Sequence, residues 1–230
     1  MDLALFDLDH TLIPGDSGLL FTRFLVERGA LDAGFEEEYL AYCRRYVEGK
    51  LDIAQMHRYT VGALARHPRE ALARWLADFE ATLAAHVPPS ARELVREHRS
   101  AGHLCALVTA TTRFIAEPFA RVLGLDELLA TEPVVDAGGR YTGEIAGAAC
   151  FREHKVEHVT AWLAQHGLAW ERLERSWFYS DSINDLALLE AVSDPVAVDP
   201  DPWLHAQAVA RGWPVRSLAS DANGLSEVAS

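Results

Sequence analysis

The sequence predicts an α/β fold in which a helical bundle is inserted after the first strand of a parallel sheet. Residues 3–6 form a short apolar run. In residues 17–86 apolar side chains then recur at spacings of three and four, which is typical of helices. Beyond Pro89, short apolar strands alternate with amphipathic helices, and this favours right-handed crossovers in a sheet covered on both faces. We therefore expect a Rossmann-like core from residues 1–15 and 88–230 and a helical cap from residues 16–87.

Glycines and prolines predict where the elements end. The four helices expected in the cap end near Gly29, near Gly49, before Pro68 and before Pro88. The later core elements are expected in this order: a helix at 90–102, a strand at 104–110, a helix at 114–124, a β-hairpin at 128–145 with its turn at Asp136 to Gly139, a helix at 152–167, a strand at 176–180, a helix at 183–192, a strand at 195–198 and a helix at 202–212. Disorder is expected only in roughly the last ten residues.

The composition excludes several classes of function. The chain carries 34 acidic and 21 basic residues, a net charge of −13, which disfavours binding to nucleic acids or anionic membranes. Its three cysteines are far apart and form no CxxC pair, so neither a disulfide framework nor a zinc site is expected. No apolar run approaches the roughly 20 residues of a membrane span, and acidic residues stand where a signal peptide would be basic. We expect a cytoplasmic protein with a small-molecule partner; the sequence leaves its oligomeric state open.

Polar residues follow several of the predicted strands at their carboxyl ends, where sheets of this kind bind ligands. Buried carboxylates without partners are costly, so we expect these to share a hard divalent cation, and Mg²⁺ suits a site that also holds a phosphate. Three predicted strands end in such residues: Asp7 with Asp9, Thr109, and Asp181 with Asp185. Lys155 stands at the start of a preceding helix.

The same residue types suit phosphate ester hydrolysis. A phosphate monoester is mostly a dianion at neutral pH, with a second pKa of about 6, and it repels an attacking carboxylate until cations neutralise both. A metal ion, a lysine and a hydroxyl provide that neutralisation, and phosphoryl transfer depends mainly on such positioning and charge compensation. A carboxylate nucleophile forms an aspartyl-phosphate, and a second acid two residues further on can shuttle the proton.

Each of these residues also has an ordinary structural explanation. Thr109 alone is a strand-end residue, Lys155 alone a solvated helix lysine, and Asp185 alone a carboxylate favoured by a helix dipole. A calcium loop is a further alternative for residues 7–12, but the third acidic ligand and the glycine at loop position six are missing. The convergence of all of them on one sheet edge favours the functional interpretation.

The motifs resemble those of the haloacid dehalogenase superfamily. "DLDHT" at 7–11 is similar to its first motif, DxDx[TV], and Thr109, Lys155 and "SDSIND" at 180–185 resemble its second, third and fourth motifs in the right order. The position and size of the helical cap resemble the phosphoserine-phosphatase-like branch, subfamily IB. Aspartate at position 7, with Asp9 behind it, favours a phosphatase over a dehalogenase.

The resemblance implies a role for each residue of the cluster. Asp7 would be the nucleophile, and Asp9 the general acid and base. Mg²⁺ would be held by Asp7, the backbone carbonyl of Asp9 and Asp181, with Asp185 in support. The phosphate ligands that it implies are Thr109 and Lys155. One departure is that Ser180 and Ser182 stand where many relatives have glycines.

The cap is expected to select the substrate. In phosphoserine phosphatases an acid shortly after the first motif binds the substrate amine, and Asp16 stands at that position. The arginine that binds the substrate carboxylate is replaced by Thr60, with Arg58 two residues earlier, about 200° away around a helix. This pattern favours an amino-alcohol phosphate such as histidinol phosphate over phosphoserine. Asp16 serves equally well as the cap of the helix that begins near Ser17. Further cap candidates, without individual support, are Arg23, Arg45, His57 and Tyr59.

Two other functions share the chemistry. A phosphotransferase or mutase would form the same aspartyl-phosphate but pass the phosphoryl group to a second substrate. A phosphate-storing signalling module also combines acids, a hydroxyl and a lysine at a sheet edge, but such modules are short and have no cap. The long helical insertion therefore favours an enzyme that encloses a small phosphorylated metabolite.

Overall fold

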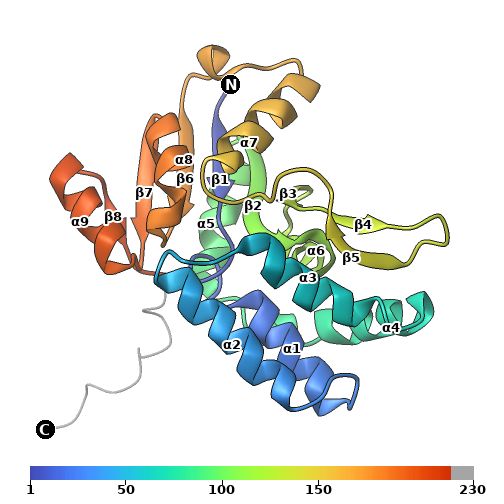
Figure 1. Cartoon of the computed structure of the whole chain (residues 1–230). Coiled ribbons are helices and arrows are strands. Elements are labelled where there is room, and N and C mark those ends of the chain that lie inside the picture. The colour runs from blue at the N-terminus through green and yellow to red at the C-terminus, as the bar shows by residue number, and fades with distance from the viewer. Residues whose placement is uncertain (219–230) are drawn as a thin grey trace, which may run out of the picture.

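The computed structural model describes residues 1–218, and the disorder expected over the final residues lies outside this range. Its core is a parallel sheet of six strands in the order β3-β2-β1-β6-β7-β8 (Figure 1). The chain winds from β1 in one direction and then returns to the other side of β1 through β6, so the order reverses between these two strands. Open α/β sheets bind ligands at the carboxyl side of such a reversal. The strands are β1 (Leu3–Phe6), β2 (Leu104–Thr112), β3 (Glu127–Thr131), β6 (Ser176–Ser180), β7 (Asp194–Val198) and β8 (Val215–Arg216).

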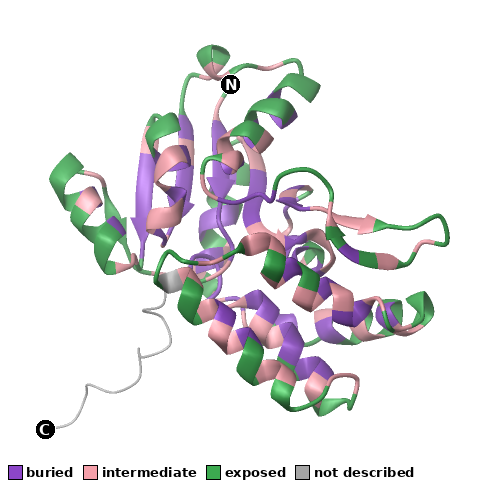
Figure 2. Cartoon of the chain, in the orientation of Figure 1, coloured by how far each residue is buried: buried purple, intermediate pink, exposed green. Residues whose placement is uncertain are grey.

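Helices cover both faces of the sheet, as expected. Side chains alternate along a strand, so Ala4 and Phe6 pack on one face of β1 while Leu3 and Leu5 pack on the other. The sheet is buried from both sides (Figure 2). The first face is covered by α5 (Pro89–Ser100) and α6 (Arg113–Leu123), the second by α7 (His154–Gln165), α8 (Leu186–Ala191) and α9 (Pro202–Arg211).

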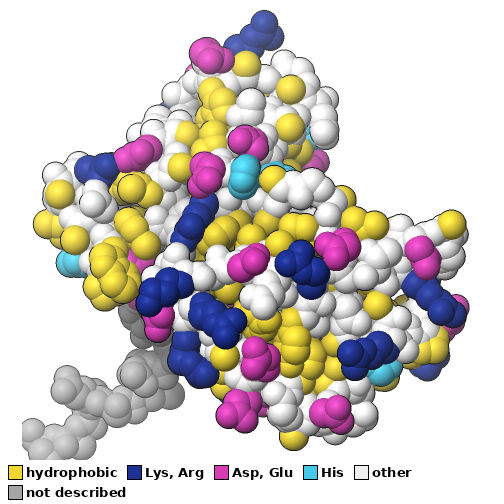
Figure 3. Space-filling view, viewed as in Figure 1, with side chains coloured by type: hydrophobic (Ala, Val, Ile, Leu, Met, Phe, Trp, Pro, Cys, Tyr) yellow, Lys and Arg dark blue, Asp and Glu magenta, His cyan; other side chains and the backbone are white. Residues whose placement is uncertain are grey.

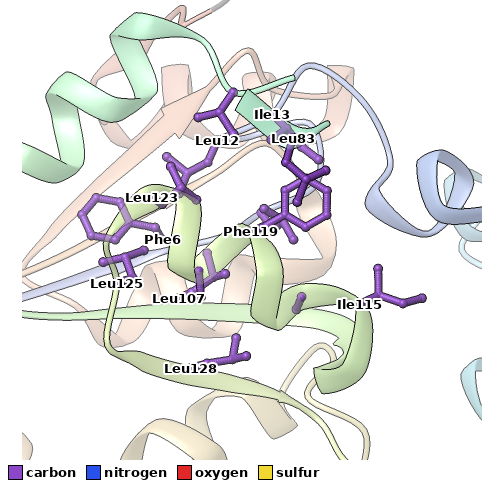
Figure 4. Close-up of a cluster of buried hydrophobic side chains, with 14 of the residues drawn as sticks. Phe6, Leu12, Ile13, Leu83, Leu107, Ile115, Phe119, Leu123, Leu125 and Leu128 are labelled. Atoms are coloured by element: carbon purple, nitrogen blue, oxygen red, sulfur yellow. The ribbon is translucent and has the colours of Figure 1, made fainter. Parts of the chain in front are cut away.

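The inserted helices lie over the carboxyl edge of the sheet (Figure 1). Aromatic contacts join them to the core: the rings of Phe21 and Phe79 are 5.0 Å apart, and Phe79 meets Phe119 of α6 at 5.8 Å. Phe119 belongs to the same buried cluster as Phe6 and Leu107 of the sheet (Figure 4). The base of the cap is thus continuous with one of the two hydrophobic cores. The helices are α1 (Ser17–Glu27), α2 (Gly34–Val47), α3 (Ile53–Leu64) and α4 (Arg69–Glu80).

The prediction of a β-hairpin at 128–145 is wrong for residues 128–131. Residues 127–131 form β3, which pairs in parallel with β2 at the edge of the main sheet. A shorter hairpin follows, β4 (Pro133–Val135) against β5 (Tyr141–Ile145), with its turn held by Asp136, which accepts hydrogen bonds from the amides of Gly138 and Arg140. Leu128 and Ala130 bury their side chains in the core, a burial that an exposed two-stranded hairpin cannot provide.

The β4–β5 hairpin packs against cap helix α3, a contact that the sequence analysis did not anticipate. Gly143 has a φ of +89°, and a Cβ atom placed on it would lie 3.2 Å from the Cα atom of Gly62. Glycine at both positions therefore lets the hairpin backbone approach the helix closely. The two-residue strand β8 was also not predicted, because so short a strand has no detectable periodicity.

The surface agrees with the composition. On the face shown in Figure 3, Lys and Arg side chains are interspersed with Asp and Glu side chains. Within residues 1–218, no helix combines the length and apolar character needed to cross a membrane.

Candidate active site

A cavity of about 390 Å³ lies between the carboxyl edge of the sheet and the cap helices. Five of the six predicted core residues line it, and the sixth, Asp185, contacts one of the five directly. The polar lining comes from the core, whereas α1, α2 and α3 supply mainly apolar and aromatic side chains. The core residues are Asp7, Asp9, Thr109, Lys155 and Asp181.

Lys155 forms the centre of a buried ion cluster. Its Nζ atom lies 2.8 Å from Asp7 Oδ1 and 2.7 Å from Asp185 Oδ2. Burial opposes the charge of Lys155, but the two carboxylates hold its pKa well above the ordinary value. Burial, together with Asp185 and Asp9 and against the effect of Lys155, raises the pKa of Asp7 to about 7. The local negative charge thus exceeds what one lysine can balance.

Thr11 links Asp7 to Asp181. Its hydroxyl lies 3.0 Å from Asp181 Oδ1 and 3.4 Å from Asp7 Oδ2, and it accepts a hydrogen bond from the Asp181 amide at 3.0 Å. Burial and repulsion from Asp7 and Asp185 raise the pKa of Asp181 well above the ordinary value. Two carboxylates held side by side with a net excess of negative charge are hard oxygen donors that fit Mg²⁺.

Within the described chain, no three His, Cys, Asp or Glu side chains are grouped as a complete metal site. Mg²⁺ does not require such a group, because it usually keeps several waters and takes one or two carboxylates together with a substrate phosphate. Two aspartate side chains and a backbone carbonyl therefore suffice, and the donor set fits the ion.

The carboxylate of Asp9 is held in place by two hydrogen bonds. One oxygen accepts a hydrogen bond from the Ser17 amide at 2.6 Å, and the other accepts from the Thr111 hydroxyl at 2.7 Å. Ser17 is the first residue of α1, so the cap begins by binding this carboxylate. Asp9 also lines the cavity.

The two serines that replace glycines have defined partners. The Ser180 hydroxyl donates to Asp185 Oδ2 at 2.7 Å and accepts from the Ser182 amide at 3.2 Å. The Ser182 hydroxyl accepts from Tyr46 of the cap at 3.3 Å. The loop is therefore accommodated by hydrogen bonds to Asp185 and to the cap.

Asp16 both caps α1 and lines the cavity. Its Oδ1 atom accepts from the Leu19 amide at 2.7 Å and from the Tyr39 hydroxyl at 2.8 Å. Burial, and then repulsion from Asp9, raise the pKa of Asp16 to about 6. The interpretation of Asp16 as a helix cap is therefore compatible with its interpretation as a residue that binds the substrate amine.

The structure does not bring Arg58 to the cavity. Its side chain is 48 % exposed and lies 3.7 Å from Glu144 of β5. The reason is helical geometry, because Thr60 lines the cavity and a residue two positions earlier lies on another side of α3.

Of the four cap candidates without individual support, only His57 lines the cavity. Arg23 pairs with Glu36, and the ring of Tyr59 stacks on Phe35. Arg45 lies over the ring of Tyr42.

Four residues that contact the site were not predicted from the sequence: Thr11, Ser17, Thr111 and Tyr46. Thr11 is the last residue of the first motif, so its position in DxDx[TV] was a usable signal. The other three act through contacts between distant segments, which leave no local pattern.

Comparisons with known proteins identify the family of the chain. The family of haloacid dehalogenase-like hydrolases matches residues 4–190. A protein named histidinol-phosphatase from Neisseria meningitidis serogroup C is 37 % identical, covering 93 % of this chain and 97 % of that protein.

Two solved structures share the fold. A protein of unknown function from Bordetella pertussis Tohama I has a TM-score of 0.88 at 43 % identity, covering 94 % of this chain and 98 % of that one. A phospho-aspartyl intermediate analogue of phosphoserine phosphatase has a TM-score of 0.67 at 23 % identity, covering 94 % and 92 %. The chain thus belongs to the haloacid dehalogenase-like hydrolases and is a phosphoric monoester hydrolase.

Proposed function

We propose that the enzyme is a Mg²⁺-dependent phosphatase that hydrolyses a small amino-bearing phosphate ester through an aspartyl-phosphate on Asp7. Histidinol phosphate is the preferred candidate substrate, ahead of phosphoserine. The observation that carries the proposal is the position of Asp7, buried in the cavity wall with Lys155 Nζ at 2.8 Å and linked to Asp181 by Thr11.

The reaction would have two steps. In the first, an Asp7 carboxylate oxygen bonds to phosphorus while the ester P–O bond breaks, and Asp9 gives its proton to the departing alkoxide. In the second, Asp9 takes a proton from water, whose oxygen attacks phosphorus and releases phosphate from Asp7. The hydrogen bonds from Ser17 and Thr111 support this role because they hold both Asp9 oxygens in position.

The phosphoryl oxygens would be bound by Lys155 and by the Thr109 hydroxyl, which both line the cavity. The residues that would hold Mg²⁺ are Asp7, the backbone carbonyl of Asp9 and Asp181, with Asp185 in support. When bound, the ion neutralises negative charge on the phosphoryl group. Burial and repulsion from neighbouring carboxylates raise the pKa values of Asp7 and Asp181, and a bound cation would offset that repulsion.

The substrate assignment rests on the cap. Asp16 is a half-buried carboxylate that lines the cavity, and an ammonium group on the substrate would neutralise it. No arginine occurs among the described residues that line the cavity, so a substrate carboxylate would have no guanidinium partner. The relative named histidinol-phosphatase supports the same choice.

The test is phosphate release by the purified chain, with and without Mg²⁺, from histidinol phosphate, phosphoserine, other amino-alcohol phosphates and sugar phosphates. We expect Mg²⁺-dependent release, strongest on histidinol phosphate and abolished in Asp7→Asn. Asp2→Asn is the matched control, just before the same strand. Failure to release phosphate from any ester, while Asp7 still accepts phosphate from a small acyl phosphate, would favour a phosphotransferase or a signalling module.

A further inference from the structure

Helix α3 presents one face to the cavity. Its cavity-lining residues are Ile53, Met56, His57 and Thr60, spaced at intervals that place side chains on the same side of a helix. Arg58 lies off this face and pairs with Glu144 of the hairpin. The cap thus presents His57, and not Arg58, to a ligand in the cavity.

One ring nitrogen of His57 is the polar atom on this face that has no partner among the described residues. The Thr60 hydroxyl donates to the backbone carbonyl of its own helix, with Met56 O at 3.0 Å. The His57 side chain is 5 % exposed, and within residues 1–218 its buried Nε2 atom has no hydrogen-bond partner. A buried polar atom in this state is destabilising, so native structures rarely leave one without a reason.

The imidazole of His57 is neutral. Burial lowers its pKa to about 4, against a smaller opposing effect from the backbone of Ala110. A neutral imidazole carries one N–H donor and one bare nitrogen acceptor, so it can form hydrogen bonds without carrying a charge. It does not attract a substrate carboxylate as an arginine would.

The cavity that His57 lines suits a largely apolar ligand group. Ala110, whose backbone interacts with His57, directly follows the proposed phosphate ligand Thr109. The other cap side chains that line the cavity are mostly apolar or aromatic, and they include Leu19, Tyr39, Leu40, Tyr46 and Met56. Ile115 of α6 adds an apolar side chain from the core. A ligand that enters this space must be compact and must carry one polar atom to meet His57.

We propose that His57 is a specificity-determining residue, whose ring nitrogen forms a hydrogen bond with a nitrogen of the substrate's imidazole. An imidazole meets both requirements, since it is flat and offers one N–H and one bare nitrogen. This inference rests on the proposed function, because it assumes that the enzyme binds histidinol phosphate.

The test compares two substrates that differ only beyond the amino alcohol: histidinol phosphate and leucinol phosphate, in which an isobutyl group replaces the imidazolylmethyl group. Steady-state phosphate release is measured for the full chain and for His57→Phe, which keeps a ring but no nitrogen. We expect the ratio of kcat/KM for histidinol phosphate to that for leucinol phosphate to fall about tenfold, mainly through KM, as for one lost hydrogen bond. His57→Gln, which can still form a hydrogen bond, should recover part of the ratio.

Activity on leucinol phosphate reports folding of the variants, and Arg58→Gln, one position along the helix and outside the cavity, should leave the ratio unchanged. If His57→Phe loses both activities, the same kcat/KM ratio is measured in His57→Gln and in a milder variant, His57→Asn. The ratio in these two variants then tests the role of His57. An unchanged ratio overturns the role of His57 and leaves the proposed function intact. Wild-type enzyme that hydrolyses leucinol phosphate but not histidinol phosphate overturns the proposed substrate, and the role of His57 with it.

Discussion

Lys155 and Asp7 are separated by 148 positions in the chain, yet their side chains form a hydrogen-bonded ion pair of 2.8 Å in the cavity wall. The first turn of α7 supplies the ammonium, and the residue after β1 supplies the carboxylate. Asp185 shares the same ammonium at 2.7 Å. One cation therefore serves two buried carboxylates, and its removal leaves both without a positive partner.

Replacing Lys155 by methionine should destabilise the protein and abolish catalysis. Breaking a buried ion pair by removing one partner typically lowers the free energy of unfolding by about 3–5 kcal/mol. The measurement is urea denaturation in the presence of a chelator, followed by phosphate release with Mg²⁺. Lys50→Met is the control, because Lys50 pairs with Glu48 on the exposed surface. Equal stability of the two variants would contradict the proposal that Lys155 stabilises the fold by pairing with two buried carboxylates.

Replacing Asp16 by asparagine separates the two roles of this residue. Asparagine is as good a helix N-cap as aspartate, so the stability of α1 should change little. The negative charge is lost, however, and kcat/KM for amine-bearing esters should fall by about tenfold to a hundredfold, as for a lost charge-assisted hydrogen bond. Esters without an amine should be hydrolysed as before or faster.

Asp52→Asn is the matched control for Asp16→Asn. Asp52 caps α3 by accepting a hydrogen bond from the Gln55 amide at 3.0 Å, and it does not line the cavity. Both variants should unfold at similar urea concentrations. If Asp16→Asn hydrolyses amine-bearing esters at the wild-type rate, the residue is a helix cap only.

The core of the fold was predictable because its signals are local. Strand β1 is a short apolar run, and the helices of the cap show regular apolar spacing between glycine and proline stops. Residues 128–131 were misassigned because only Glu132 separates β3 from the following hairpin, so the two segments form one continuous stretch in the sequence. Whether such a strand joins β2 or its neighbour depends on tertiary packing, which a local pattern does not record.

In the candidate site, too, the residues in local motifs were predictable and the contacts between distant segments were not. Asp7 and Thr109 could be placed at one edge because parallel strands align their carboxyl ends, and Lys155 was expected to reach it from the start of a helix. The partners of Asp9 could not be predicted, since Thr111 reaches it from β2 and Ser17 from the first turn of the cap. His57 was one of several cap candidates, and only the side of α3 that faces the cavity distinguishes it from Arg58.

His98 gives the protein a pH-dependent stability that is separate from catalysis. The ring is 8 % exposed, and it packs between Phe6, Trp177 and Tyr179, with the Tyr179 hydroxyl 2.8 Å from Nε2. Burial, with added repulsion from His103 and Arg216, lowers the pKa of His98 to about 4. In the unfolded chain an ordinary histidine has a pKa of about 6.5.

Stability should therefore fall as the pH is lowered from 6.5 toward 4, because in this window the unfolded state binds a proton at His98 that the folded state does not. At 1.36 kcal/mol per pH unit, the loss from this group between pH 7.5 and pH 5 is about 2 kcal/mol. His98→Gln retains a hydrogen-bonding group for Tyr179 but does not titrate, so its unfolding free energy should decline less over the same range. His205→Gln, at an exposed position on α9, should follow the wild type. Parallel pH curves for His98→Gln and the wild type in urea denaturation would show that His98 is not responsible.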